Sequence, residues 1–509
     1  MKKLVLVFFF LSEMVFAQKR NNVWCFGDSA GIDFNNLSNP QPIVSSVHGR
    51  GSCVSIADST GNLLFYANTG NRNFTPWYGY ETEVWSYDNS KMQNGDSLMG
   101  LAWYKELLII PKSYEDSLYY LITFDVTPNY GFCYSIIDLK QNNGLGAVVQ
   151  KNIFVSNGTD LIDALASVKH GNGRDWWVLN HKGYNATNSN KFFRVLVTPD
   201  NVNYLVQQSI GSNQNTSLGT IKISVDGTKV LVVNYYGLVE LFNFNRCTGF
   251  LDSARTISSE SFSSPKQYIG CSFSPSGRFI YVSNTDNIFG DSLRLYQYDI
   301  TAPNIAASRK TIYTAQVPAS GGHHQLGPDG KIYIACLYEY GFPYADSIHN
   351  IYSDNLSVIN YPDSLGTACD FQPFSFYLGG HRTYWGLPNN PDYELGAWVG
   401  SPCDTITSVQ QFNSSTVQQP DMFVFYHHSW QKLFINAQHL NGKNCLLQIF
   451  DVTGKIIYSN VRGLYPSGVG GSAGGYFTMD INCAAFAKGM YVVSLQTEKE
   501  KLVKKFVKE

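Results

Sequence analysis

The residues that could support catalysis or metal binding are few, and three histidines stand out among them. His323 and His324 are adjacent and precede a Gly-Pro-Asp-Gly turn at 327–330, and His381 follows later in the chain. Neighbours on a strand point to opposite faces, so one of the pair could approach a central channel. A metal site needs several converging His, Asp or Glu ligands. No spacing marks such a set, so we predict no metal and no cofactor and keep the three histidines as candidate binding residues.

Three short serine motifs resemble those of hydrolases. Residues 27–31 have the pattern Gly-x-Ser-x-Gly, and Gly-Asp-Ser-Leu occurs at 95–98 and 290–293. A nucleophile elbow presents its serine between a strand and a helix. The residues after Gly31 lack a helical pattern, and the other two motifs lie at expected turns between strands. We therefore predict structural turns and no catalytic residue.

Three aromatic residues, Trp77, Tyr78 and Tyr80, lie close together in the segment 73–80. Aromatic rings in an exposed loop can stack on sugars or contact proteins. The alternative is a loop whose rings pack against its own sheet. We keep these three residues as candidates for binding a glycan or protein ligand.

The composition indicates strands and turns. Of the 509 residues, 44% are hydrophobic, 15% are aromatic and 15% are charged, against a typical charged fraction of roughly 25%. The 37 basic and 39 acidic residues give a net charge of −2, which excludes a global attraction to nucleic acid or to anionic membranes. The abundance of Tyr, Phe and Gly predicts an all-β chain.

A repeat with a period of roughly 50 residues covers most of the chain. Each copy has a turn residue followed by an apolar run rich in β-branched and aromatic residues, and then a second such run, which is typical of strands. This period, with four strands in each copy, is typical of a β-propeller blade. The turn residues are Gly61, Ser117, Gly173, Gly227, Gly277 and Gly330.

Strand-like segments at both ends of the repeat region could complete a further blade. These segments are 24–34 and 374–388. A blade with strands from both ends would close the ring and remove open sheet edges. We predict a β-propeller over residues 18–402, with seven blades favoured. A six-bladed ring and an array of β-sandwiches are the alternatives.

Residues 1–17 have the pattern of an export signal. Lys2 and Lys3 precede the apolar run 4–11, and Ala17 is a small residue at a plausible cleavage site. A buried N-terminal strand is the alternative. No later stretch is apolar for long enough to span a bilayer, so the mature chain is predicted to have no transmembrane segment.

The ten cysteines include no Cys-x-x-Cys pair, which argues against a zinc ribbon. Disulfides are common in exported proteins. From proximity in the sequence alone, we consider pairs of Cys247 with Cys271 and of Cys369 with Cys403. Buried free thiols are the alternative.

A large family of exported propeller proteins from Gram-negative bacteria that use type IX secretion is similar to this chain in the segments 24–34, 245–249, 270–284, 325–335 and 386–405. The resemblance covers about residues 21–405 and implies an architecture without an assigned activity. The pattern Ser-Pro-x-Gly-x-x-x-Tyr-Val at 274–282 is also similar to lactonase-like and surface-layer propellers.

The C-terminal region differs in character from the repeat. Residues 403–419 are rich in Ser, Thr, Gln and Asn, which is typical of a linker. Short strand-like runs over 420–509 predict a small β-sandwich. This module closely resembles the type A C-terminal sorting domain of type IX secretion cargo, in the blocks 446–459, 481–497 and 501–509. The resemblance assigns features of the sorting signal to Gly454, Lys455, Gly489, Tyr491, Lys504 and Lys505.

The resemblance implies export in two steps, with the type IX machinery as partner and the cell surface or the medium as destination. We expect the propeller to act as a binding module for a glycan or protein. One alternative is a secreted hydrolase or lactonase-like enzyme that uses the propeller channel, which would need convergent carboxylates or histidines around the axis. A structural role in the envelope is the other.

Overall fold

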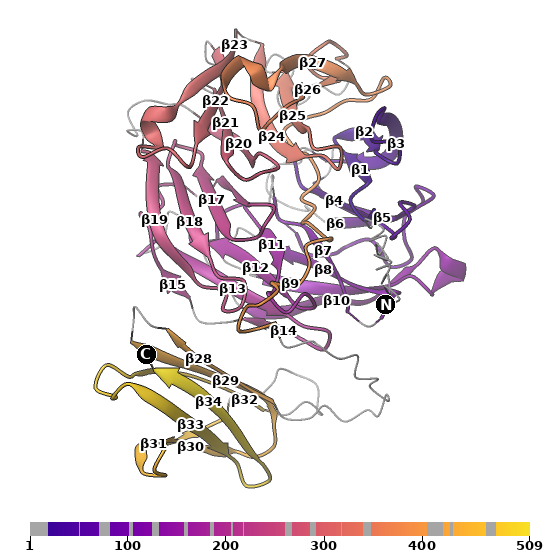
Figure 1. Cartoon of the computed structure of the whole chain (residues 1–509). Helices are drawn as coiled ribbons and strands as arrows, with labels where there is room; N and C mark the ends of the chain where they lie inside the picture. The colour runs from indigo at the N-terminus through magenta and orange to yellow at the C-terminus, as the bar shows by residue number, and fades with distance from the viewer. Residues whose placement is uncertain are drawn as a thin grey trace, which may run out of the picture. The chain divides into compact units, whose positions relative to one another are not determined.

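The computed structural model (Figure 1) divides the chain into two compact units, Met1–Thr407 and Ser408–Glu509. The predicted leader 1–17, the aromatic residues Trp77, Tyr78 and Tyr80, and most of the predicted linker lie outside the described residues. The structure describes residues 19–49, 51–70, 82–100, 105–113, 115–124, 132–156, 161–183, 188–204, 207–216, 218–259, 267–285, 292–316, 318–338, 348–404, 421–427, 431–464 and 475–508.

Both units are built of β-strands, as the composition predicts. Across the described ranges, the other regular elements are short 3-10 turns such as 142–144 and 366–369. In the same ranges, no helix has the length and apolarity needed to cross a membrane.

The first unit begins with four antiparallel sheets. In chain order they consist of β1 (Val23–Phe26), β2 (Asp28–Asp33) and β3 (Gln41–His48); β4 (Cys53–Ala57), β5 (Leu63–Thr69) and β6 (Thr82–Ser86); β7 (Leu108–Pro111), β8 (Leu118–Phe124), β9 (Phe132–Asp138) and β10 (Ala147–Ser156); and β11 (Ala166–Lys169), β12 (Trp176–His181), β13 (Lys191–Val197) and β14 (Val202–Tyr204), with β15 (Gln208–Ser209) beside β13.

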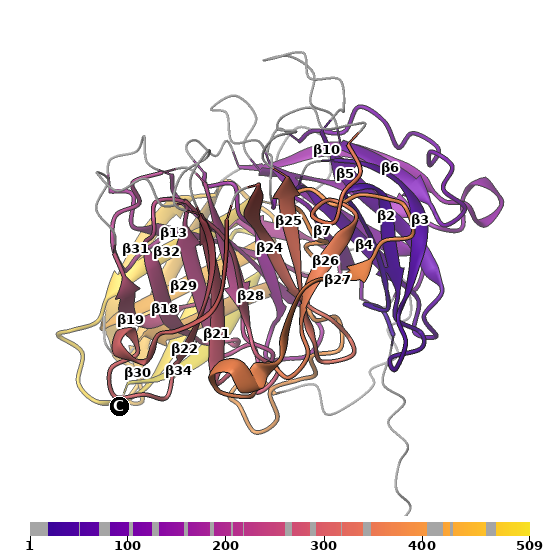
Figure 2. The ribbon, with the colours of Figure 1, turned by 90° about the horizontal axis from the view of Figure 1, so that it is seen from above.

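Three four-stranded sheets complete this unit, and Figure 2 shows their strands side by side. They consist of β16 (Gly219–Ile223), β17 (Lys229–Asn234), β18 (Val239–Phe244) and β19 (Leu251–Ser258); β20 (Gln267–Phe273), β21 (Phe279–Thr285), β22 (Ser292–Asp299) and β23 (Lys310–Gln316); and β24 (Ala319–Leu326), β25 (Ile332–Tyr338), β26 (Asn355–Ile359) and β27 (Phe371–Tyr377).

The sequence repeat corresponds to these sheets. Each of its six turn residues lies in the turn just before the second strand of a sheet, namely β5, β8, β12, β17, β21 and β25. Gly277, which precedes β21, has a φ of 73°, a conformation that glycine adopts without the penalty paid by residues with a Cβ. The repeated turn therefore starts the same strand in each of these sheets.

The sheets form a closed ring, which makes the first unit a β-propeller. First strands of successive sheets lie next to one another, as β16 does to β20 and β20 to β24. The first and last sheets also meet, since the rings of Trp24 and Tyr333 have centroids 5.6 Å apart and those of Phe34 and Tyr333 5.3 Å apart. These aromatic contacts bury the junction in one hydrophobic cluster.

The expected closing blade differs in detail from the prediction. Strand β27 is the outermost strand of the β24–β27 sheet and does not join the sheet of β1. The segment after β27 instead pairs with the sheet of β1 through an isolated β-bridge between Arg382 and Asp28. The sequence pattern located both strands, but their partners depend on how the ring closes.

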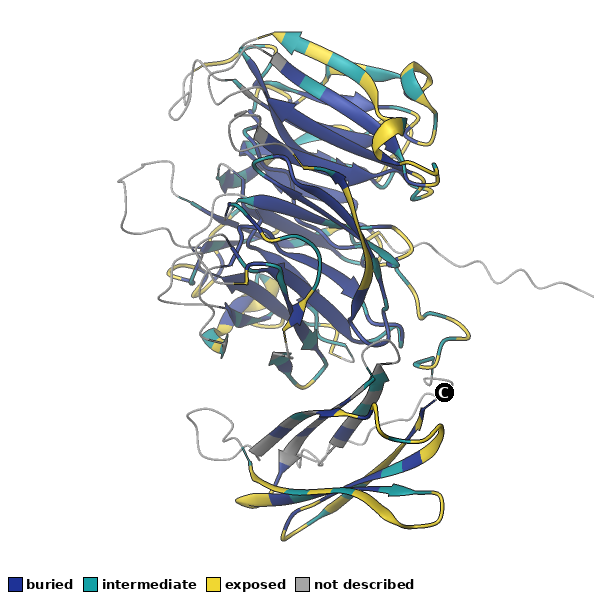
Figure 3. Ribbon diagram, turned by 90° about the vertical axis from the view of Figure 1, so that its left-hand side faces the viewer, coloured by how far each residue is buried: buried dark blue, intermediate teal, exposed yellow. Residues whose placement is uncertain are grey.

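The second unit is a β-sandwich. One sheet has the order β28 (Asp421–His427), β29 (Lys432–Leu440) and β32 (Gly475–Asn482); the other has the order β31 (Ile456–Gly463), β30 (Asn444–Asp451), β33 (Gly489–Gln496) and β34 (Lys501–Lys508). Strand β28 lies against β34. Side chains from both sheets, among them Leu433, Ile435, Leu447 and Val493, share one buried core. Figure 3 shows that the second sheet has exposed positions as well as buried ones, and along β30 buried residues alternate with intermediate ones.

Candidate functional site

The segment after β27, residues 383–404, runs across the centre of the propeller, and we call it the axial strap. It is visible in Figure 1 as an orange trace that crosses between the sheets. The N–H of His323 in β24 donates to the carbonyl of Trp385 at 2.7 Å, and the hydroxyl of Tyr393 donates to the carbonyl of Ile109 in β7 at 3.0 Å. The strap thus joins sheets that are far apart in the sequence.

Asn389 shows most clearly that the strap follows the axis. Its backbone N–H donates to the carbonyl of Cys53 at 2.8 Å. Its side-chain nitrogen donates to the carbonyls of Leu107 at 3.1 Å and Leu165 at 3.0 Å. These acceptors lie in or just before the first strands of three successive sheets, and Asn389 is buried. One residue can contact three sheets in this way only where their inner strands converge.

At Gly386, the backbone of the strap packs closely against the backbone that precedes β4. A Cβ atom on Gly386 would lie 2.0 Å from the carbonyl oxygen of Gly51, a distance that real Cβ atoms do not show. Any residue other than glycine would therefore push the strap away from the start of β4. The protein's own chain fills this part of the propeller centre.

Two lysines extend into the same region. Lys105 is buried, and its Nζ donates to the carbonyl of Leu387 at 3.2 Å. Lys222 is partly exposed, and its Nζ donates to the side-chain oxygen of Gln325 at 2.6 Å. Burial lowers the pKa of Lys105 well below its usual value, and the neighbouring Lys222 lowers it further. Burial also lowers the pKa of Lys222 to about 8. Lys105 thus contacts the strap directly, whereas Lys222 contacts the inner strand β24.

The structure places His323 and His324 on the inner strand β24, and both are buried. The Nε2 atom of His324 lies 3.0 Å from the hydroxyl of Ser283. Burial is the main cause that lowers the pKa of both imidazoles, to about 3 for His324, and the nearby lysines add to it. Both rings are therefore neutral at physiological pH. His381 is partly exposed and lies in the turn after β27.

The histidines do not form a metal centre with other side chains. Among the residues that the structure describes, no three His, Cys, Asp or Glu side chains lie close enough together to hold a metal ion. The other candidate ligand-binding residues, Trp77, Tyr78 and Tyr80, belong to the connection 70–81 between β5 and β6, outside the described residues.

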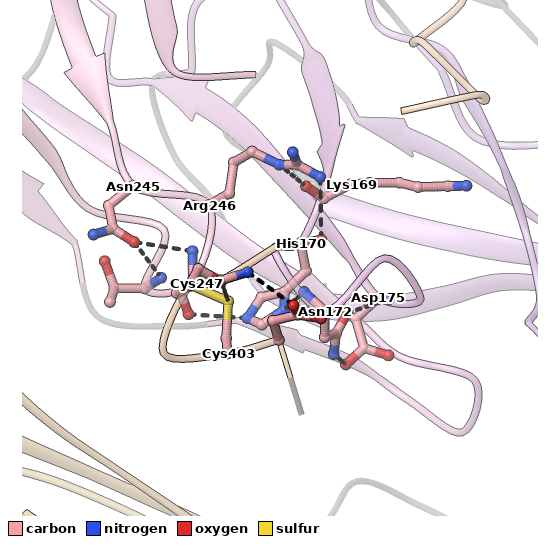
Figure 4. The surroundings of a disulfide bond; sticks show 12 residues. Lys169, His170, Asn172, Asp175, Asn245, Arg246, Cys247 and Cys403 are labelled. Atoms are coloured by element: carbon pink, nitrogen blue, oxygen red, sulfur yellow. Dashed lines mark hydrogen bonds between the residues drawn. A yellow bond between two sulfur atoms is a disulfide. The ribbon is translucent and has the colours of Figure 1, made fainter. Parts of the chain in front are cut away.

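The end of the strap is fixed by a disulfide between Cys247 and Cys403, with Cα atoms 5.5 Å apart (Figure 4). The pairs Cys247 with Cys271 and Cys369 with Cys403 were therefore wrong. Cys271 and Cys369 are buried free thiols. Cys271 lies on the inner strand β20, away from the β18–β19 turn that holds Cys247. The strap brings Cys403 to that turn. Cysteines that are close in the sequence need not be close in space, because contacts between repeats join residues that are far apart in the chain.

Hydrogen bonds around the disulfide connect the strap to two neighbouring sheets (Figure 4). The Nε of Arg246 donates to the carbonyl of Lys169 at 2.9 Å, and its guanidinium also donates to the carbonyl of Gly396. The ring nitrogen Nε2 of His170 lies 2.9 Å from the carbonyl oxygen of Cys247. Since the partners are mostly backbone carbonyls, this cluster is a structural anchor.

The serine motif at 27–31 begins at Gly27, between β1 and β2, and its other residues form the start of β2. Gly27 and Ser29 have φ values of 65° and 60°, and the serine lies on a strand with no helix after it, unlike the serine of a nucleophile elbow. Asp28 forms an ion pair with Arg382 in the turn that leads into the strap. The motif therefore supports the closure of the ring.

The predicted sorting residues lie at distinct places in the second unit. Gly454 has a φ of 84° in the β30–β31 turn, where Asp451 accepts hydrogen bonds from the backbone of Thr453 and Lys455. Gly489 begins β33 with a φ of 151°. Tyr491 is buried, and its hydroxyl donates to the carbonyl of Ala487 at 2.6 Å. Lys504 and Lys505 are exposed on β34.

Lys508 is a structural residue that the sequence analysis missed. Its Nζ donates to the carbonyls of Cys483 at 2.8 Å, Ala484 at 3.1 Å and Phe486 at 2.7 Å. The side chain is buried. An ammonium group has three donors, so these three carbonyls satisfy it completely. The only signal in the sequence was the excess of lysine in the last strand.

Comparison with known protein families identifies the second unit. Residues 430–509 match the family model described as the secretion system C-terminal sorting domain. This match agrees with the resemblance found in the sequence, and the β-sandwich is therefore a type IX sorting domain. No curated protein is similar enough in sequence to match this chain.

Solved structures similar to this chain are distant. A provisionally assigned 6-phosphogluconolactonase of Bacteroides fragilis is 11% identical, with a TM-score of 0.41, and the match covers 66% of this chain and 89% of that one. A similarly assigned protein of Bacteroides uniformis is 13% identical, with a TM-score of 0.40 and coverages of 66% and 92%. A protein from Lactobacillus plantarum is 11% identical, with a TM-score of 0.41 and coverages of 72% and 98%. No activity of the present chain follows from these likenesses.

Proposed function

We propose that this protein is exported by the type IX secretion system to the cell surface or the medium of a Gram-negative bacterium, where its propeller binds a glycan or a protein. The observation that carries the export step is the sorting domain at 430–509. The disulfide Cys247–Cys403 supports a destination outside the cytoplasm, because disulfides persist mainly in oxidising compartments.

Binding at the rim of the propeller suits the geometry better than binding in its channel. The axial strap occupies the convergence of the inner strands, with Asn389 bonded to three sheets. A ligand that entered the centre would have to displace the strap. The faces of the ring carry the connections between strands, and binding residues are commonly located on such connections.

The two faces differ in the length of their connections. Connections between the first and second strands of a sheet are short turns, such as 224–228 and 274–278. Most connections between the second and third strands are longer, as at 70–81 and 339–354. Since strands alternate in direction, these two sets leave opposite faces. The face from which the longer connections leave is our choice for the ligand-binding surface, because Trp77, Tyr78 and Tyr80 belong by sequence to the connection 70–81.

A secreted hydrolase or lactonase-like enzyme is the alternative function. It would need acid or base groups that converge on a substrate in the channel. Two basic groups there are engaged in structural contacts, since Lys105 donates to the carbonyl of Leu387 in the strap and the ring of His324 contacts the hydroxyl of Ser283. An enzyme of this kind would require the strap to leave the axis.

Export and binding can be tested separately. Removal of residues 420–509 should retain the protein inside a host with a type IX system, whereas the full chain should appear outside the cell. The secreted chain should bind members of a glycan and peptide panel, and Trp77→Ala should weaken that binding. Tyr361→Ala is the matched control, because Tyr361 is an exposed aromatic residue outside the long-loop connections. Equal loss in both variants would contradict the assignment of the face.

A further inference from the structure

The outer face of the sheet β31-β30-β33-β34 in the sorting domain is unusually apolar. The inward positions of its strands, such as Leu447, Ile449 and Val493, form the core of the sandwich. The opposite face of such a sheet is normally polar, because it meets water. Here several outward positions carry large aliphatic side chains instead.

The register of the strands shows that these side chains are neighbours. One row across the sheet places Ile456 opposite Phe450, Phe450 opposite Val492, and Val492 opposite Lys505. A second row pairs Met490 with Val507, and a third ends with Val503 beside Ser494. The outer face, as defined here, consists of Leu446, Gln448, Phe450, Ile456, Ser459, Val461, Met490, Val492, Ser494, Gln496, Lys501, Val503, Lys505 and Val507.

Much of this apolar surface is exposed in the chain. The exposed fractions of Ile456, Val461, Met490, Val503 and Val507 lie between 44% and 63%. Single exposed apolar residues are common, but a contiguous group of this kind marks an interaction surface. A group on one sheet face can be covered by a partner without any change in the fold.

The charges on the face limit the choice of partner. Lys501 and Lys505 are its only charged residues, and no Asp or Glu occupies these strand positions. A second copy of the same face would bring lysines near lysines, which disfavours a symmetric dimer. A membrane surface would be expected to contact Trp or Tyr side chains, and the face has neither.

We propose that the outer face is the docking surface for a protein component of the secretion machinery that presents apolar residues with acidic residues at their edge. This inference rests on the proposed export by type IX secretion. Burial of the valines and Met490 would supply most of the affinity, and the two lysines would select the acidic partner.

The test compares export of full-length variants. Met490→Gln/Val503→Thr/Val507→Thr removes apolar surface, and Thr retains a high preference for strands. Export should fall by about tenfold or more, with the protein held inside the cell. Val452→Thr is the matched control, because Val452 is exposed in the β30–β31 turn, outside the face. It should be exported normally. The thermal unfolding of each purified variant should match that of the parent chain.

A second pair of variants tests the charges. Lys505→Glu should reduce export more than Lys505→Gln, because it repels an acidic partner as well as losing an attraction. Lys488→Glu, in the exposed segment before β33, should have no effect.

The possible results separate the two proposals. If removal of 420–509 does not prevent export, the proposed function fails. If it prevents export while the face variants are exported normally, only the docking surface is wrong. If vesicles of anionic phospholipid bind the purified full chain, and the face variants lose this binding without any change in export, the face is a lipid surface and the proposal is overturned.

Discussion

Cys403 is bonded to Cys247, which lies 156 residues earlier in the sequence, and this bond fixes the end of the axial strap to the β18–β19 turn. The strap is also the last segment before the connection to the sorting domain. A pull on that connection therefore reaches the disulfide before it reaches the hydrogen bonds of the strap. We infer that the disulfide keeps the strap bonded to the ring when force is applied to the chain through its C-terminal unit.

Loss of this disulfide should destabilise the propeller. The change Cys247→Ser/Cys403→Ser should lower the free energy of unfolding by about 2–5 kcal/mol, because the closed loop is long. Urea unfolding of the secreted chain measures the loss. Reductant should shift the parent chain by a similar amount and leave the double variant unchanged. An equal effect of reductant on both would show that a different disulfide is responsible.

Asn389→Ala should be among the most destabilising single changes in the strap. It leaves the buried carbonyls of Leu107 and Leu165 without the donors seen in the structure. The expected cost is about 2–4 kcal/mol, since each orphaned buried group costs about 1–3 kcal/mol. Asn39→Ala changes the same residue type at an exposed position and should cost little. Denaturant unfolding compares the two variants, and equal small effects would contradict the bridging role.

The buried imidazole of His324 should make the protein sensitive to acid. Its pKa falls from an ordinary value of 6.5 to about 3 in the folded chain, chiefly because of burial. Below pH 6.5 the unfolded chain takes up a proton that the folded chain does not, so stability decreases as the pH falls towards 3. His324→Gln should show a smaller loss between these values when unfolding is measured against pH. His381→Gln, at a partly exposed histidine, should follow the parent chain.

Lys508→Met should loosen the end of the sorting domain. The carbonyls of Cys483, Ala484 and Phe486 lose a buried ammonium donor, at a cost of about 2–4 kcal/mol for hydrogen bonds to a charged group. Hydrogen exchange of the full chain should become faster in β33 and β34. Lys501→Met, on an exposed position of the same strand, should leave the exchange unchanged. Faster exchange in both variants would assign the effect to loss of positive charge.

Local patterns in the sequence determined the class of fold and the presence of the C-terminal sorting domain. Alternating and apolar runs behind turn residues such as Gly277 and Gly330 predicted the strands, because strand formation depends on residues close together in the chain. The three blocks of the C-terminal module predicted the sorting domain for a similar reason. These blocks carry signals that can be read locally, such as the turn at Gly454 between the paired strands β30 and β31.

The tertiary structure alone decided what occupies the centre of the propeller. The partner of Cys403, the three acceptors of Asn389 and the place of Lys105 all depend on which inner strands converge, and those strands lie far apart in the sequence. No pattern within one repeat records a contact between repeats. The sequence therefore indicated His323 and His324 without their surroundings, and only closure of the ring showed that these two side chains are buried beside a strap formed by the chain itself.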